Sequence, residues 1–140
     1  MKLFLIALIV LTSLFALAKD KETIEQLQSR AESAEPKKKP KLYAQLADRQ
    51  IEQADHLYNN DIEAAKKMVA DGVESALLAA KNAIDTGKDL KHTEIRLRKL
   101  NDRIGDLQRS WAFEDRQVLK SGSEKIDEAR SKLLDRMFKK

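Results

Sequence analysis

Small and apolar residues recur at alternating steps of three and four through the middle of this chain. They are Ile62, Ala65, Val69, Gly72, Ala76, Ala79 and Ala83. This spacing places them on one face of an α-helix, whereas a strand turns every second residue to the same side. Because nearly all of them are small, they predict a seam against which a second helix packs closely. Such a seam explains Gly72, which costs about 1 kcal/mol relative to alanine inside a helix.

The helical period extends over most of the sequence, which has only two prolines and scarcely any run of β-branched residues. The pattern predicts helices over about residues 21–35, 41–59, 61–86, 89–119 and 122–138. Short connections at residues 59–61, 86–89 and 120–122 favour antiparallel neighbours. We therefore expect an all-α fold, an up-and-down antiparallel helical bundle of four main helices plus a short N-terminal helix.

Local signals mark several expected helix ends. Asn60 followed three residues later by Glu63 has the pattern of a capping box at the start of the third helix. Ser121 followed by Glu124 repeats that pattern in the segment SGSE, so the last helix is expected to begin there. Gly87 is the C-terminal glycine that ends the third helix.

The expected fourth helix carries the only tryptophan of the chain. On a wheel of 100° per residue, one seam contains Leu90, Thr93, Leu97, Leu100, Ile104, Leu107, Trp111 and Val118, with Glu114 as its polar break. Trp111 is therefore expected in the core. Ile95 and Phe113 project from the opposite face. Either the first or last helix covers them, or they form an exposed patch that contacts a partner protein.

The first 18 residues have the three-part pattern of a secretory signal peptide. Its parts are the positive Lys2, the apolar run from Leu3 to Leu17, and the small residues Ala16 and Ala18. The run is shorter than the roughly 20 residues of a membrane-spanning helix, so cleavage after Ala18 is expected rather than retention as an anchor. Residues 19–140 then form one exported domain, periplasmic or secreted, without a stable membrane anchor.

Composition limits the partners of this domain. With no cysteine, the domain must be stable without disulfides. The chain has 27 basic and 23 acidic residues, net +4, and loss of Lys2 lowers that charge by one. A nucleic-acid-binding helix should show a more nearly unbroken basic stripe, so nucleic acid is not expected as a partner.

Lysines gather in two segments of the sequence. They are Lys37, Lys38 and Lys39, which lie in PKKKP, and Lys139 and Lys140 at the end of the chain. Pro40 suits the first turn of the second helix, so PKKKP reads as a solvated linker. The functional alternative is contact of both lysine segments with a polyanion or a membrane surface.

No motif of a known catalytic chemistry occurs in the sequence. It has no cysteine nucleophile, no G-x-S-x-G turn, no S-x-x-K pair and no glycine-rich phosphate loop. The best metal candidate is Asp48, Glu52, Asp55 and His56, spaced along one side of a helix. Because His56 lies far around the wheel from Ala54, this side is expected to face water. No catalytic residue, cofactor or metal ligand is therefore assigned.

The segment LYNNDIEAAKKMVADGVESA, about residues 57–76, resembles a tetratricopeptide hairpin. Asn60, Asp61, Ile62 and Ala65 fall where that motif has its turn and first packing alanine. The expected proline end is missing, and no second copy follows at a spacing of about 34 residues. The resemblance implies a helical hairpin suited to protein contacts. The whole layout, with TEIRLRKL and FEDR, is similar to uncharacterised exported bacterial all-helical proteins, a likeness that implies no activity.

These patterns predict an exported non-enzymatic protein that acts in protein–protein interaction or scaffolding in the cell envelope. Its candidate partner contacts are Ile95 and Phe113. The alternative function is a weak polyanion or membrane-surface binder that uses the lysine segments. A third is an enzyme or metal-binding bundle without a recognisable motif. A homo-oligomer is also compatible with the pattern, because apolar seams can close within one chain or between two.

Overall fold

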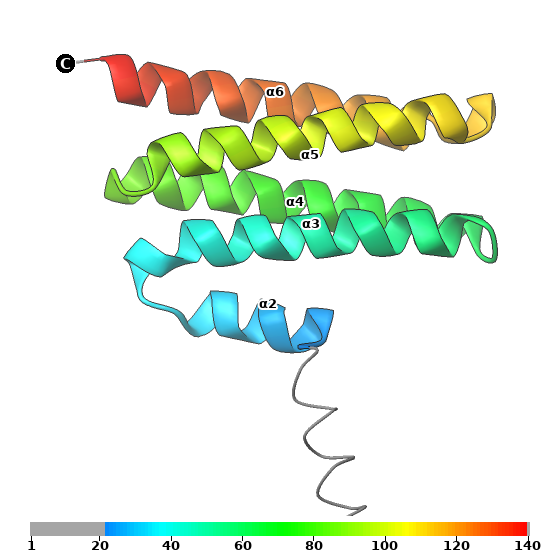
Figure 1. Cartoon of the computed structure of the whole chain (residues 1–140), viewed down its shortest axis with the longest axis horizontal. Coiled ribbons are helices and arrows are strands. Elements are labelled where there is room, and N and C mark those ends of the chain that lie inside the picture. Colours follow the sequence, from blue (N-terminus) through cyan, green and yellow to red (C-terminus); the bar gives the residue numbers. More distant parts are fainter. Residues whose placement is uncertain (1–21, 140) are drawn as a thin grey trace, which may run out of the picture.

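A computed structural model of the chain describes residues 22–139, which contain five α-helices, two short 3-10 helices and no strand (Figure 1). In chain order these are α2 (Ile24–Ser33), η1 (Pro36–Lys38), α3 (Lys39–Tyr58), α4 (Ile62–Thr86), α5 (Leu90–Ser110), η2 (Phe113–Asp115) and α6 (Gln117–Phe138). The predicted all-α bundle of four main helices with a short N-terminal helix is confirmed. The predicted signal peptide, residues 1–18, lies outside the described residues.

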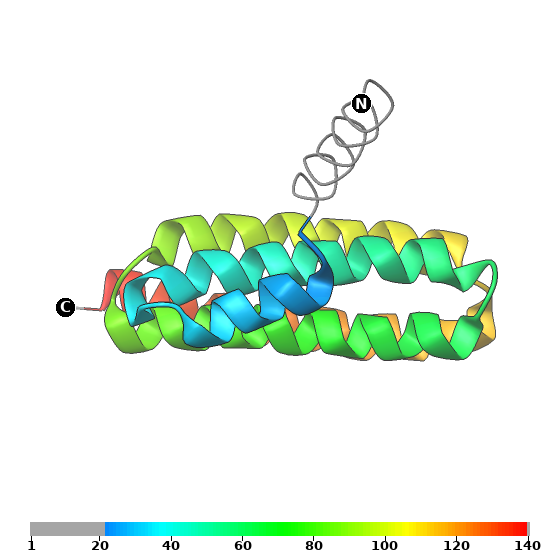
Figure 2. The same cartoon turned by 90° about the horizontal axis from the view of Figure 1, so that it is seen from below.

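The four long helices run up and down, with α3 beside α4, α4 beside α6, and α6 beside α5 (Figures 1 and 2). The turns α3–α4 and α5–α6 therefore lie at one end of the bundle, which we call the aromatic end (residues 58–62 and 111–116). The opposite end, here the lysine end, consists of residues 36–41, 87–91 and 136–139.

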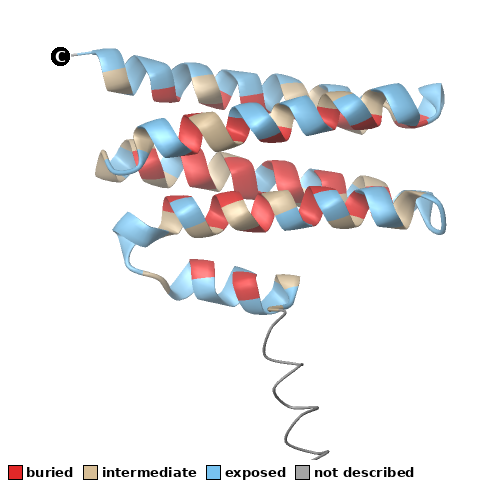
Figure 3. Cartoon of the chain, viewed as in Figure 1, coloured by how far each residue is buried: buried red, intermediate tan, exposed pale blue. Residues whose placement is uncertain are grey.

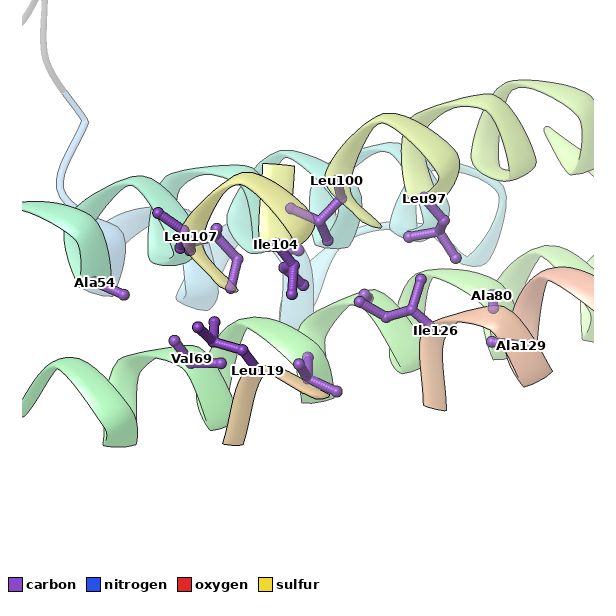
Figure 4. Packing of buried hydrophobic residues seen from close by; sticks show 14 of the residues in the cluster. Ala54, Val69, Ala80, Leu97, Leu100, Ile104, Leu107, Leu119, Ile126 and Ala129 are labelled. Atoms are coloured by element: carbon purple, nitrogen blue, oxygen red, sulfur yellow. The ribbon is translucent and has the colours of Figure 1, made fainter. Parts of the chain in front are cut away.

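Buried side chains line the inner faces of the long helices and form one core (Figure 3). The seam predicted for the fourth helix is buried at Thr93, Leu97, Leu100, Ile104, Leu107 and Trp111. Figure 4 shows the leucines and Ile104 of α5 pointing toward Leu119 and Ile126 of α6. The seam predicted in α4 is also buried, except at its first position, Ile62, which is 43% exposed.

Two glycines allow the core helices to approach one another closely. A Cβ added at Gly72 of α4 would lie 2.8 Å from Ile51 Cδ1 of α3, which confirms the close approach predicted there. A Cβ at Gly122 of α6 would lie 2.6 Å from Val73 Cγ2 of α4. Neither distance leaves room for a methyl group unless a neighbouring side chain moves.

The short helix α2 packs across α3 and α4, outside the four-helix core (Figure 2). It begins with a capping box that the sequence analysis did not identify, in which the Thr23 and Gln26 side chains accept reciprocal backbone bonds. Its buried contacts are Leu27 and Ala31, which meet Tyr43, Ala44, Leu46 and Ala79.

The predicted boundary between the last two helices is wrong. α5 ends at Ser110 rather than near residue 119, and α6 begins at Gln117 rather than 122. Trp111 leaves the helix with extended backbone, φ −75° and ψ 153°. The SGSE segment lies inside α6, so Ser121 caps no helix. The chain turns at residues 111–116 because of contacts with distant residues, described below.

The start of α4 is also shifted from the prediction. Asp61, not Asn60, is its N-cap, and the Asp61 carboxylate accepts a hydrogen bond from Ala64 N at 3.1 Å. The capping box predicted with Glu63 is therefore wrong. Gly87 ends α4 in the left-handed region, φ 68°, as predicted. Pro40 lies in the first turn of α3, also as predicted.

Candidate functional site

Phe113 is the most exposed large apolar side chain among residues 22–139, with 83% of its surface open to solvent. It belongs to η2, in the α5–α6 turn at the aromatic end. Ile62 lies at the same end, in the first position of α4. Single exposed apolar residues are normal on protein surfaces. What distinguishes Phe113 is the way in which the turn that carries it is held.

Tyr58 and Asp115 hold both sides of the turn that carries Phe113. The Ala112 N–H donates to the Tyr58 hydroxyl oxygen at 2.8 Å, and that hydroxyl donates to Asp115 Oδ2 at 2.8 Å. The other carboxylate oxygen of Asp115 lies 3.1 Å from Lys66 Nζ of α4. Asp115 itself is only 7% exposed. The residue before Phe113 and the second residue after it are thus bonded to one phenol.

Trp111 adds an apolar support beneath the same turn. Its ring stacks on that of Tyr58, with centroids 4.3 Å apart and planes inclined by 6°. The Trp111 carbonyl accepts a hydrogen bond from Arg116 Nε at 2.8 Å. The turn is therefore held by α3, by α4 and by the residue that precedes α6. Sequence reasoning missed Tyr58, Lys66 and Asp115 as a group, because Tyr58 and Asp115 lie 57 positions apart.

The network shifts the pKa of each member in the direction that stabilises its ionisation state at neutral pH. The hydrogen bonds from Tyr58, then from Lys66, lower the pKa of Asp115 below its ordinary 3.8. The bond to Asp115 raises the pKa of Lys66 above 10.5. For Tyr58, the Ala112 N–H acts to lower the pKa. The bond to Asp115, burial and the negative charges of Asp115 and Glu114 together outweigh it and raise the pKa above 10.0. An anionic Asp115, a cationic Lys66 and a neutral Tyr58 complete the network.

Ile95 and Phe113 do not share a helix face. Ile95 is half-buried within α5, and Phe113 lies beyond the end of that helix in η2. The expectation that both project from one helix five turns apart is wrong, because α5 ends at Ser110. Contact of either residue with a partner stays a prediction.

The two lysine segments lie at the same end of the bundle, the lysine end (Figure 1). Lys37 and Lys38 are exposed in η1, and Lys139 is exposed after α6. Lys39 donates from Nζ to the Glu32 carbonyl at 3.0 Å, and Lys140 lies outside the described residues. The lysine end holds eight bases and one acid, whereas the aromatic end holds three acids and one base. Opposite charges thus predominate at the two ends.

The candidate metal residues of α3 are not gathered around one point. Asp48 pairs with Arg96 of α5 at 2.7 Å, whereas Glu52, Asp55 and His56 are exposed. Asp48, Glu52 and His56 line a groove of about 700 Å³ beside α2. Over residues 22–139, no three histidine or acidic side chains are placed to hold a metal ion together.

No protein-family model, curated protein or solved structure matches this chain. The tetratricopeptide resemblance over residues 57–76 and the likeness to exported helical proteins therefore stay predictions. Within the part of the chain that the structure describes, every helix is too short or too polar to cross a membrane.

Proposed function

We propose that the protein is an exported, non-enzymatic helical bundle that binds another protein in the cell envelope through its aromatic end. One observation carries this proposal. Phe113 is almost fully exposed on a turn that hydrogen bonds from two other helices, α3 and α4, hold in one conformation. The signal-peptide pattern of residues 1–18 supports the envelope location.

An exposed aromatic side chain on a bonded turn is well suited to be the central contact of an interface. Ordering a flexible side chain at an interface costs about 0.5–1.5 kcal/mol, and the bonded turn reduces the part of that cost that falls on the backbone. Burying a phenylalanine contributes about 1.5–3 kcal/mol, and aromatic anchors in fitted pockets supply much of the binding energy in measured interfaces. Glu114 is exposed beside Phe113. The partner should therefore offer an apolar pocket with a basic rim.

The test is a pull-down from the envelope fraction of the source organism with tagged residues 19–140, followed by binding measurements with the purified partner. Phe113→Ala should weaken binding about tenfold or more, which corresponds to about 1.4 kcal/mol, and leave the helical content unchanged. Phe138→Ala is the matched control, because Phe138 is 79% exposed at the other end of the bundle. Equal losses in the two variants, or none in Phe113→Ala, would contradict the proposal.

The alternative is a weak polyanion or membrane-surface binder, which the gathering of bases at the lysine end favours. In that case, replacing both Lys37 and Lys38 by glutamine should lower the affinity for heparin or anionic vesicles and flatten its dependence on salt. The control replaces Lys67 and Lys120, which lie outside the lysine end. Binding that ignores salt would remove this alternative.

A further inference from the structure

A shallow groove between α4 and α6 has an apolar floor. Leu77, Ala80 and Ile84 of α4 and Ala129 of α6 form this floor, and the groove encloses about 360 Å³. Ala80 and Ala129 meet between the two helices (Figure 4). Because both side chains are small, they leave a depression between the larger Leu77 and Ile84, which are half-buried.

Three lysines and two acids form the rim of this groove. Lys81 pairs with Asp85 at 3.2 Å within α4, and Lys132 pairs with Glu128 at 3.5 Å within α6. Lys125 also lines the groove and forms no ion pair with any of residues 22–139. Exposed pairs within a helix are weak. The rim therefore keeps an excess positive charge at Lys125 beside an apolar surface.

The Phe113 turn has the complementary character. An exposed phenyl ring is followed directly by the exposed carboxylate of Glu114, which forms no ion pair within the described residues. A groove of about 360 Å³ has room for a phenyl ring. An apolar tip beside a negative charge thus matches an apolar groove beside a positive one.

We propose that Phe113 of one copy binds in the α4–α6 groove of a second copy, with Glu114 next to Lys125. This inference rests on the proposed function above and names a second copy of this chain as the partner. Phe113 cannot reach the groove of its own chain. Fifteen helical steps, about 22 Å at 1.5 Å per residue, separate Leu77 from Ile62 at the aromatic end.

The geometry determines the kind of assembly. Each copy carries one Phe113 tip and one groove at different places, so the contact is heterologous and extends into open chains or closed rings. One aromatic residue and one ion pair bury much less surface than the roughly 1,200–2,000 Å² of stable interfaces. Association should therefore be weak and depend on protein concentration, with more than one subunit added as concentration rises.

The first experiment is sedimentation velocity of residues 19–140 from micromolar to millimolar concentration. The weight-average sedimentation coefficient should rise with concentration for the unmodified protein and for Phe138→Ala, but stay at the monomer value for Phe113→Ala. Lys125→Glu should also remove association, whereas Lys120→Glu on the same helix should not, because Lys120 does not line the groove. Exchanging the charges, Glu114→Lys with Lys125→Glu, should restore it.

Mixing two defective variants gives the sharper test. The Phe113→Ala variant has an intact groove but no phenyl ring, and the Lys125→Glu variant has an intact Phe113 turn but an altered groove. Each alone should therefore be monomeric. In a mixture, the Phe113 turn of the second variant should bind the groove of the first, giving a one-to-one dimer that grows no further. A protein that stays monomeric at millimolar concentration, or a mixture that does not associate, would overturn this inference. If the Phe113→Ala variant nevertheless failed to bind a different envelope protein that the unmodified protein captures in the pull-down, the proposed function would stand, but the partner would not be a second copy.

Discussion

Gly122 and Gly105 are both inside helices, yet they meet different surroundings. A Cβ at Gly122 would lie 2.6 Å from Val73 Cγ2, a methyl of a stiff β-branched side chain in the core. A Cβ at Gly105 would find only Arg109 Nη1 within 4 Å, at 3.8 Å. Glycine is therefore required by packing at the first position and by nothing visible at the second. At Gly122 the low helix propensity of glycine is offset by the close contact that it allows between α4 and α6.

Alanine substitutions should consequently change stability in opposite directions. Gly122→Ala gains about 1 kcal/mol of helix propensity but loses about 1–3 kcal/mol to overpacking, so it should lower the free energy of unfolding by up to about 2 kcal/mol. Gly105→Ala should raise it by about 0.5–1 kcal/mol. Urea unfolding of both variants measures the difference. If Gly122→Ala were as stabilising as Gly105→Ala, the α4–α6 contact would be looser than described.

The α5–α6 turn illustrates how an element without glycine or proline is shaped. Residues 111–116 contain neither, and the backbone leaves the helix at Trp111. Its conformation depends on Tyr58 and Lys66, which belong to other helices. Helix α5 thus ends where bonds to these distant partners become available. Because Asp115 is ionised in this network, the stability of the turn should depend on pH.

The stability contribution of this network should be constant between about pH 5 and 9 and fall on both sides. The lowered pKa of Asp115 makes its contribution complete above its unfolded pKa near 3.8 and lost as pH falls through the folded pKa. The raised pKa values of Tyr58 and Lys66 make theirs complete below 10.0 and 10.5 and lost as pH rises through the folded values. Unfolding measured from about pH 7 down to about pH 2 should show the difference in free energy of unfolding between wild type and Asp115→Asn narrowing below the unfolded pKa of Asp115.

A matched control for that series is Asp102→Asn, since Asp102 is exposed in α5 and forms no ion pair with the described residues. Its free energy of unfolding should stay close to that of wild type over the whole pH range of the Asp115→Asn series. A gap between wild type and Asp115→Asn that does not change in acid would show that the carboxylate contributes nothing through its charge.

Across the molecule, stability is divided between a four-helix core and the attached helix α2. The core joins residues of α3, α4, α5 and α6 in one cluster, whereas α2 contributes Leu27 and Ala31 to a smaller one. An isolated helix of the length of α2 is marginal in water, so α2 depends on these contacts. We therefore expect α2 to open separately from the rest of the bundle.

Two leucine-to-alanine variants test this division. Leu97→Ala should lower the global free energy of unfolding by about 2–5 kcal/mol, because Leu97 is 1% exposed and belongs to the core cluster that joins the four long helices. Leu27→Ala, at a position buried almost as completely, should accelerate amide exchange in residues 24–33 and leave exchange in α4 and α5 nearly unchanged. If Leu27→Ala accelerated exchange equally throughout, α2 would belong to the same cooperative unit as the core.

The fold class, the helix number and most core positions could be predicted because the apolar period of a helix is a local property of the chain. Gly72, Gly87 and Pro40 were also interpretable, since backbone freedom and the missing proline donor act on adjacent residues. The end of α5 could not be predicted. The apolar register continues from Leu107 to Trp111 and again at Val118, so the local pattern is the same whether or not the helix stops between them.

The candidate site depends on that stop. Tyr58 forms hydrogen bonds with Ala112 and Asp115, which lie 54 and 57 positions away in the sequence. These bonds exist only once α3 and α5 lie in the same bundle. Local pattern placed Phe113 on a helix with Ile95, whereas packing placed it on a bonded turn in solvent. Periodicity thus specifies which residues of each helix face inward, because it arises between neighbours in the chain. The turn that exposes Phe113, and the groove formed where Ala80 meets Ala129, arise between helices and follow from their assembly.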